Sequence, residues 1–441
     1  MQIRIILLTL LSLGGMSVSG HAQQTMSLND AIQYALANSP DIKVAQLQVS
    51  DADWQIKENT ATALPQFSGS IAYQYFIQRP GIPASALGFP GTGDEKIAFS
   101  ALHSLTPTLS YNQLFFSNSY RVAKKAAWYY RALVDQQLVA TKRTVYNRVV
   151  DAYLPALLIS DNLATLDKNI GNLDKLLSDT RAINQAGFAE QLDVDRLDLS
   201  LSSLRSERGN LVRQREIVVA ALKLAMGMPV GQEVVLSDDV QKLMATYTDA
   251  DLTSDLNLMN RPDYIALLKS RDLSALQIEL NSKPWMPSFA GFLQYSPGFQ
   301  GGFGDDSKWF FIPSAVAGVS INFTIWDGGI SKARRQRALI GVQTLDTQKQ
   351  MLENAIALEV ETGRKQYLNA QERVASQQRN LDLAQRIYDT TQTKYKAGVG
   401  SSFEVTQAEQ GLYTAQQNVM QARYDLLSAR ITIRKALGLD K

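Results

Sequence analysis

Residues 319–326 read Val-Ser-Ile-Asn-Phe-Thr-Ile-Trp, a stretch in which apolar and polar side chains alternate. Successive side chains of a β-strand point to opposite faces, so this alternation predicts a strand with one apolar and one polar face. The apolar face should meet lipid or a protein core, and the polar face should meet water. The residues expected on the apolar face are Val319, Ile321, Phe323 and Ile325.

Three further segments show weaker forms of the same pattern. They run from Phe67 to Tyr75, from Thr108 to Phe115 and from Phe289 to Tyr295, the last with Phe292 on its polar side. Each is about as long as the ~10 residues that a tilted strand needs to cross a bilayer, and aromatic residues stand near the ends. The strands alone also fit a soluble sheet packed against helices.

Two long loops favour the membrane interpretation. They extend from Arg79 to His103 and from Pro297 to Pro313, and both are rich in proline and glycine. Membrane barrels carry long irregular loops at one end. His103 is expected to be a solvated loop residue.

Four strands cannot close a barrel, because membrane barrels need about eight or more strands and lipid does not tolerate open sheet edges. The chain must therefore assemble with other copies if it spans a membrane. A dimer would supply eight strands and a trimer twelve, and the strand pattern does not choose between them.

The chain contains an internal repeat. Asn38, Pro40 and Asp41 recur 222 residues later as Asn260, Pro262 and Asp263, and a second series recurs at an offset of 211. The second series pairs Ala186, Gly187, Val194, Ala225 and Gly227 with Ala397, Gly398, Val405, Ala436 and Gly438. The repeat predicts a first half over residues 23–228, a linker over 229–251 and a second half over 252–441.

The later part of each half is predicted to be a long helical hairpin. Apolar residues recur at alternating spacings of four and three along Ala408, Leu412, Ala415, Val419, Ala422, Leu426, Ala429, Ile433 and Ala436. Such a pattern indicates a coiled coil, and the alanines indicate close backbone approach. Helices from Arg121 to about Ala186 and from Ser331 to about Lys396 precede the Ala-Gly turns, and ~65 helical residues reach about 100 Å.

The amino terminus resembles a signal peptide over residues 1–22, with Arg4, an apolar core and Gly20-His21-Ala22 at the cleavage site. Beyond it no uninterrupted apolar run of ~18 residues predicts a membrane helix. Lysine and arginine number 44 against 42 acidic residues, so charge does not favour nucleic acid.

The residue types restrict the chemistry that the chain can perform. There is no cysteine, and only His103 remains after removal of the leader. No disulfide, thiolate metal site or multi-histidine site can form, and no nucleophile motif or phosphate-binding loop is present. We therefore expect no catalytic residues, no metal site and no cofactor, and the chain is not expected to be an enzyme.

Several motifs resemble the TolC-type outer membrane factor family over nearly the whole mature chain. They are Ser27-Leu28-Asn29-Asp30-Ala31-Ile32, Asn38-Ser39-Pro40, Leu64-Pro65, Ile325-Trp326-Asp327-Gly328-Gly329 and the Ala-Gly turns at Gly187 and Gly398. Their order and duplication are more specific than any single motif.

The resemblance implies a mainly α-helical protein with a transmembrane β part. It implies a homotrimer with a twelve-stranded barrel in the outer membrane of a Gram-negative bacterium and a twelve-helix periplasmic tube. Such a protein exports substrates in a tripartite efflux pump or a type I secretion system, together with a periplasmic adaptor and an inner-membrane transporter. The hairpin tips would dock the adaptor through Gly187, Phe188, Gly398 and Val399.

The resemblance also implies a gate at the tips. Family members narrow the pore with acidic residues six and nine positions after the second turn glycine, and these positions hold Glu404 and Gln407. Asp193 takes the corresponding first-repeat position, while the position of a latching arginine holds Gly400. Glu404 and Asp193 could equally be acids that stabilise the first turn of a helix. We expect packing that includes Phe403 to hold the tip closed.

A periplasmic coiled-coil scaffold is the alternative function. It would share the heptads without requiring amphipathic strands of membrane length. The sequence leaves open whether the exported substrate is a drug, a metal or a protein.

Overall fold

The computed structural model describes residues 24–88, 96–98, 100–247, 254–302 and 308–439. The predicted signal peptide at residues 1–22 lies outside these ranges. The chain divides into two compact units, which are discontinuous in sequence. The tip unit contains described residues of 1–42, 142–255 and 359–441, and the sheet unit contains those of 43–141 and 256–358. Each predicted repeat contributes to both units.

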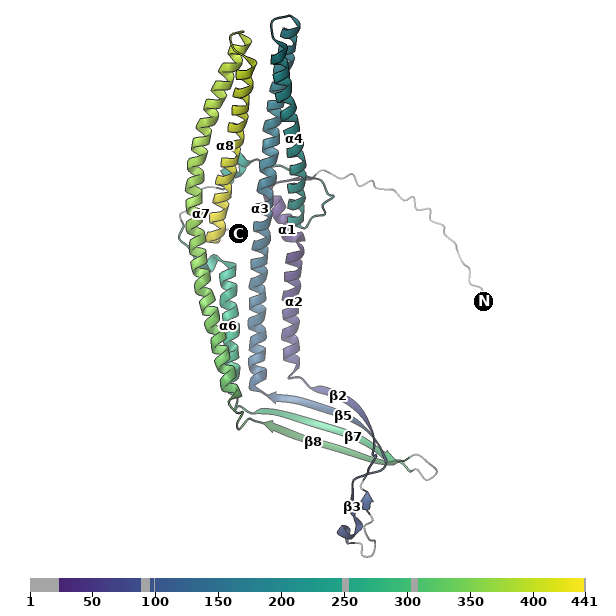
Figure 1. Ribbon diagram of the computed structural model, residues 1–441. Helices are drawn as coiled ribbons and strands as arrows, with labels where there is room; N and C mark the ends of the chain where they lie inside the picture. The colour runs from purple at the N-terminus through teal and green to yellow at the C-terminus, as the bar shows by residue number, and fades with distance from the viewer. Residues whose placement is uncertain (1–23, 89–95, 99, 248–253, 303–307, 440–441) are drawn as a thin grey trace, which may run out of the picture. The chain divides into compact units, whose positions relative to one another are not determined.

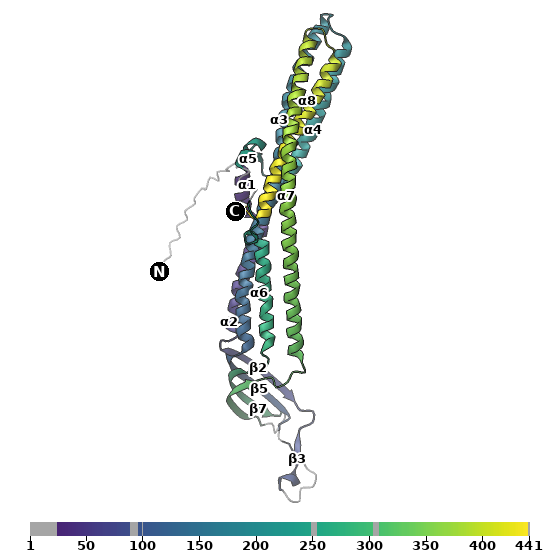
Figure 2. The same cartoon turned by 90° about the vertical axis from the view of Figure 1, so that its left-hand side faces the viewer.

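Two long helical hairpins build most of the tip unit. Helix α3 (Asn118–Gln185) is followed by α4 (Gln191–Met226), and α7 (Ile330–Lys396) is followed by α8 (Ser402–Leu437). The two hairpins lie side by side in both views (Figures 1 and 2). The bounds agree with the predicted helices.

The alternating apolar seam of α8 forms a large part of this core. Ala408 is half-buried, and the seam residues after it are buried: Leu412, Ala415, Val419, Ala422, Leu426, Ala429, Ile433 and Ala436. Closer to the turns all four helices meet, since Leu173 of α3, Leu197 of α4 and Val405 of α8 form one cluster against which Tyr395 of α7 packs.

The two hairpin turns have the same geometry because each ends on a glycine in the left-handed conformation. Gly187 has φ 84° and Gly398 has φ 75°, values that side chains with a Cβ rarely adopt. The next amide reaches back to the helix in each case, from Phe188 to Ile183 and from Val399 to Lys394, both at 3.0 Å. This pairing satisfies helix-end carbonyl groups at both tips.

Short elements complete the tip unit. Strand β1 (Gln24–Met26) pairs in parallel with β6 (Val234–Leu236), and α1 (Leu28–Asn38) and α5 (Val240–Thr246) follow them in sequence. The buried Tyr153 hydroxyl donates to the Met26 carbonyl at 3.1 Å and contacts Asp238 at 3.1 Å.

The sheet unit contains a four-stranded antiparallel sheet in the order β2-β5-β7-β8 (Figure 1). These strands are β2 (Gln66–Tyr75), β5 (His103–Phe116), β7 (Ser288–Gly301) and β8 (Phe310–Asn322). Helices α2 (Pro40–Ala61) and α6 (Pro262–Ser282) accompany the first halves of α3 and α7, and a 3-10 turn at Leu258–Asn260 precedes α6. Arg131 of α3 pairs with Asp53 of α2 at 2.7 Å.

Strand register aligns the faces of all four strands. Phe67, Tyr111, Leu293 and Ala317 lie opposite one another on one face. Ser68, Ser110, Gln294 and Val316 form the adjacent row on the other face. Because a shift of one residue would exchange the faces, this agreement fixes an apolar face and a more polar face for the whole sheet.

Phe292 is an apolar residue on the more polar face. Its ring covers Gly318 of the neighbouring strand, where an added Cβ would lie only 2.7 Å from the ring. The missing side chain of Gly318 therefore creates the space that Phe292 fills.

The structure corrects the predicted bounds of the strands. Strand β8 begins at Phe310 and ends at Asn322, so the prediction that Phe323 and Ile325 belong to this strand is wrong. Residue Asn322 pairs with Ser288, the first residue of β7, and no residue of β7 remains to pair with the positions beyond. Val319 and Ile321 do lie in β8 and are exposed on its apolar face.

The predicted loops are correspondingly shorter. Within the first loop β3 (Gly81–Pro83) pairs with β4 (Lys96–Ala98), and a 3-10 turn occupies Ala84–Leu87. His103 is not a loop residue: it begins β5, and its Nδ1 lies 2.7 Å from the Tyr73 hydroxyl. Much of the second predicted loop is strand, because β7 reaches Gly301 and β8 starts at Phe310.

Among the residues that the structure describes, one helix meets the length and composition of a membrane span. The window lies within α3 and is 50% buried by the rest of the chain. A core helix of a soluble protein passes the same test, so this single window is weak evidence for a span.

Candidate functional site

The hairpin turns present apolar side chains to the surroundings. Phe188 is 86% exposed and Val399 is 78% exposed, each directly after a turn glycine. The two predicted docking pairs, Gly187 with Phe188 and Gly398 with Val399, thus occupy equivalent positions on the two hairpins. Exposed large apolar groups on a tight turn are suited to contact with another protein.

The first two turns of α8 carry three of the predicted gate residues, Phe403, Glu404 and Gln407. Ser401 caps the helix, and its hydroxyl accepts a hydrogen bond from the Glu404 amide at 3.3 Å. Glu404 and Gln407 are both exposed. A carboxylate in this position is favourable next to the positive end of the helix dipole, whatever further role it has.

Phe403 is also exposed, and Arg196 of α4 lies over its ring, 5.6 Å from the centroid. The cation–π contact joins the start of α8 to α4. Phe403 therefore takes part in packing between the two hairpins.

Asp193 makes a different contact between the hairpins. Its carboxylate accepts a hydrogen bond from the hydroxyl of Ser402, a fully buried residue at the start of α8. The carboxylate is thus engaged by a neighbouring helix. Gly400 is tightly placed, because a Cβ there would lie 3.1 Å from the Tyr395 amide nitrogen.

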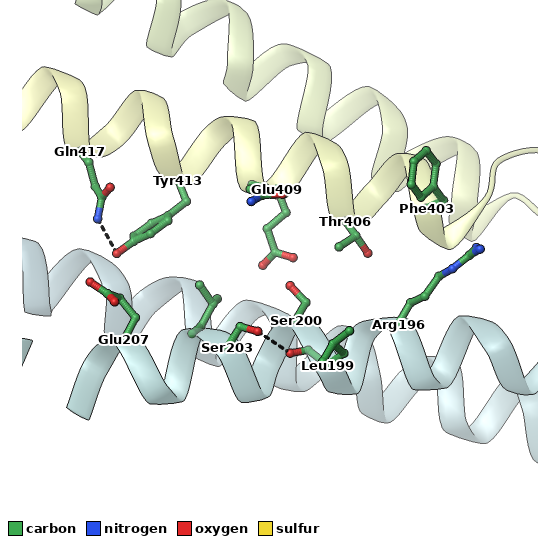
Figure 3. A pocket seen from close by; sticks show the side chains of 12 residues that line it. Arg196, Leu199, Ser200, Ser203, Glu207, Phe403, Thr406, Glu409, Tyr413 and Gln417 are labelled. Carbon is green, nitrogen blue, oxygen red and sulfur yellow. Dashed lines mark hydrogen bonds between the residues drawn. The ribbon is translucent and has the colours of Figure 1, made fainter. Parts of the chain in front are cut away.

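A groove of about 500 Å³ lies between α4 and α8, several residues beyond the turns. Figure 3 shows Phe403 and Arg196 at one end and Tyr413 and Glu207 at the other. The Gln417 amide donates to the Tyr413 hydroxyl at 2.6 Å. The Glu409 carboxyl group points from α8 toward Ser200 and Ser203 of α4 (Figure 3).

Glu409 is the buried carboxyl group of this groove. The residue is 7% exposed, and its Oε2 has no hydrogen-bond partner in the described part of the chain. Burial raises the pKa of this carboxyl group to about 7, because the charged form loses hydration. Near neutral pH, Glu409 can therefore be present in either protonation state.

The sequence predictions did not include Glu409 or Ser402. Glu409 directly follows the seam residue Ala408, a position that a single heptad pattern leaves to solvent. Helix α4 of the first hairpin covers it, and contacts between two hairpins leave no signal in the apolar period of a single helix. No group of three or more metal-ligand side chains occurs among the residues that the structure describes.

The sequence matches a known protein family over most of its length. The family model described as outer membrane efflux protein matches residues 31–228 and 254–439. The chain belongs to the outer membrane efflux protein family. The predicted family, mainly helical fold class and outer-membrane localisation are thereby confirmed.

Curated relatives of this efflux protein are distant but nearly full-length. The pyoverdine export outer membrane protein OpmQ of Pseudomonas aeruginosa is 25% identical over 420 residues, covering 93% of this chain and 85% of the relative. The toxin and drug export protein A of Aggregatibacter actinomycetemcomitans is 21% identical, covering 93% and 86%.

Solved structures share the fold of the efflux protein. The outer membrane protein VceC of Vibrio cholerae superposes with a TM-score of 0.69 at 16% identity, covering 93% of this chain and 96% of that chain. The open-state MtrE outer membrane channel of Neisseria gonorrhoeae gives 0.70 at 15% identity, covering 93% and 88%. This protein is an outer-membrane efflux protein with the fold of outer-membrane channels.

Proposed function

We propose that three copies of this chain assemble into one conduit through the outer membrane, with a twelve-stranded barrel and a twelve-helix periplasmic tube. The observation that carries the proposal is the open sheet with an aligned apolar face. Edge strands β2 and β8 each have one side without a partner strand in the described part of the chain. Lipid does not tolerate unpaired backbone groups, so these edges must pair with other copies.

The hairpin tips form the periplasmic entrance of this conduit. Phe188 and Val399, with Gly187 and Gly398, supply the surface for a periplasmic adaptor, which links the conduit to an inner-membrane transporter. Glu404 contributes one carboxylate per copy to an acidic ring at the entrance. Gln407 adds no charge to it.

Contacts between hairpins keep the entrance closed in this proposal. Asp193 bonds to Ser402, and Phe403 packs against Arg196, so both join α4 to the first turn of α8. The names of relatives support a role in small-molecule efflux, since they include pyoverdine export and a toluene efflux pump of Pseudomonas putida.

Cross-linking of the strand edges tests the assembly. The chain has no cysteine, so introduced cysteines are the only thiols. Ala72→Cys in β2 combined with Ser314→Cys or Val316→Cys in β8, all on the more polar face of the sheet, should give disulfide-linked dimers and trimers in outer membranes. In the matched control, Ala290→Cys in the interior strand β7 is used in place of Ala72→Cys. This control should give only monomers.

Monomers from every edge combination, with intact protein in the membrane, would contradict closure through β2 and β8. A protein that remains in the periplasm without heat-modifiable migration would instead support the scaffold alternative.

A further inference from the structure

The first two turns of α7 carry four exposed cations. They are Lys332, Arg334, Arg335 and Arg337, and we name this group the basic collar. No ion pair joins any of the four to an acidic side chain in the described ranges of the chain. The first acid on α7 is Asp346, which already pairs with Arg271 of α6 at 2.5 Å.

Helix formation does not explain the basic collar. The start of a helix carries partial positive charge, which favours acids and disfavours cations. The amides at the start of α7 already have partners, because Asp327 accepts hydrogen bonds from Gly329 at 3.0 Å and from Ser331 at 2.8 Å. Four uncompensated cations at this end of a helix therefore indicate an anion from outside the chain.

The residues before the basic collar indicate which anion this is. Between the end of β8 and the collar, the chain exposes Phe323, Ile325 and Trp326, the last two at 88% and 85%. The order along the chain is thus an apolar strand, an exposed aromatic segment and then cations. A bilayer presents hydrocarbon, interface and charged headgroups in the same order.

The first repeat provides a weaker counterpart. Strand β5 ends at Phe116, and α3 then exposes Lys124, Lys125 and Trp128. Here Glu279 of α6 offsets part of the charge, since it pairs with Lys125 at 2.9 Å and with Arg121 at 3.8 Å. The uncompensated cations are therefore concentrated at the start of α7.

We propose that the basic collar binds the phosphate groups of anionic phospholipids at the periplasmic end of the barrel, while Ile325 and Trp326 lie in the adjoining interface. Arginine suits this role because its planar guanidinium can hold phosphate oxygens in pairs. The inference rests on the placement of the strands in the outer membrane.

The experiment uses the full mature chain in phosphatidylcholine vesicles. Quenching of tryptophan fluorescence by brominated phosphatidylglycerol is compared with quenching by brominated phosphatidylcholine. The wild type should prefer phosphatidylglycerol. Each substitution of a collar cation by glutamine should lower this preference for phosphatidylglycerol over phosphatidylcholine by about fivefold. Trp326→Phe should remove a large part of the preferential quenching.

Two variants serve as controls. Replacing Arg334, Arg335 and Arg337 by lysine keeps the charge and should keep most of the preference. The matched control removes four exposed cations from the distal part of the same helix, and it should leave the preference unchanged. These four are Arg379, Arg386, Lys394 and Lys396.

Three outcomes separate the possibilities. An unchanged preference after Lys332, Arg334, Arg335 and Arg337 all become glutamine overturns the proposal. Dissociation of this variant into monomers, with the preference retained in the remaining trimers, also overturns it and assigns the collar to contacts between copies. Failure of the wild type to enter vesicles would contradict the proposed conduit itself.

Discussion

Glu409 makes the stability of the tip unit sensitive to pH. Its carboxyl pKa is about 7 in the folded chain, against 4.5 for an ordinary glutamate. Below pH 4.5 the group is neutral in both states and costs nothing. Between pH 4.5 and 7 the unfolded chain releases its proton first, so the folded state loses up to about 3 kcal/mol of stability as pH rises.

Glu409→Gln should therefore raise the unfolding midpoint at pH 8 and leave it nearly unchanged at pH 4.5. Circular dichroism during thermal unfolding at the two pH values measures the difference. Glu404→Gln, at an exposed position, is the control and should not reproduce the effect. Equal gains from Glu409→Gln at both pH values would show that the ionisation of this carboxyl is not the cause.

Individual residues of the tip were only partly accessible from the sequence. The resemblance to the family located Glu404 and Gln407, because its members carry their gate residues six and nine positions after the turn glycine, here Gly398. The partner of Asp193 could not be found in this way, since Ser402 lies 209 positions further along the chain. The roles of these residues in gating stay predictions.

At the scale of the helices, the alanine seam of α8 sets how closely the helices approach. Ala415 is 8% exposed, so Ala415→Leu must insert three carbon atoms into packed space. Such overpacking costs about 1 to 3 kcal/mol. The midpoint of helical unfolding should fall accordingly, whereas Ala408→Leu, at the half-exposed first position of the seam, should cost less. Equal midpoints for Ala415→Leu and the wild type would contradict close packing at this position.

Depth along β8 should determine how the sheet tolerates charge. Ala317 lies near the middle of the strand on its apolar face, while Ile321 is one residue from its end. Ala317→Arg should cost about 2 to 4 kcal/mol, but Ile321→Arg only about 0 to 1 kcal/mol, because the cost falls toward the interface.

The yield of heat-modifiable trimers in outer membranes measures this difference. Ser314→Arg, on the opposite face of β8, is the control and should assemble nearly as well as the wild type. Equal losses for Ala317→Arg and Ser314→Arg would contradict the assignment of the lipid face.

The elements differ in how well the sequence predicted them. Helices α3, α4, α7 and α8 were predictable because the apolar period of each helix is sustained. A glycine in the left-handed conformation also marks the turn between the two helices of each hairpin. Strand β8 was misplaced by several residues, because the alternation continues through Phe323 and Ile325 after the pairing partner has ended. Alternating apolar and polar side chains indicate which residues can form a strand. Where the strand ends depends on where its neighbouring strand ends.

For the whole molecule, the proposed acidic ring predicts ion selectivity. Three copies of Glu404 near one axis would attract cations, so the closed conduit should be cation-selective in planar bilayers. Glu404→Gln should weaken this preference, and Gln407→Ala is the neutral control. Phe403→Ala should increase leakage, because it removes the contact with Arg196. Unchanged selectivity in Glu404→Gln would leave Glu404 as a residue that stabilises the helix start.

The strand pattern does not determine how many chains form the barrel. Pairing rules show that the sheet must be completed by other chains, but eight and twelve strands satisfy them equally. Only the resemblance to a known family favoured three copies.

The unpaired edges of β2 and β8 also have a consequence for biogenesis. A single chain cannot enter lipid and wait there, since its two edges would remain without partners. Insertion must therefore accompany the meeting of several chains, and its rate must rise steeply with their concentration. At low expression the slow step is the encounter between copies, and the time spent unassembled is when proteases have access to the exposed strands.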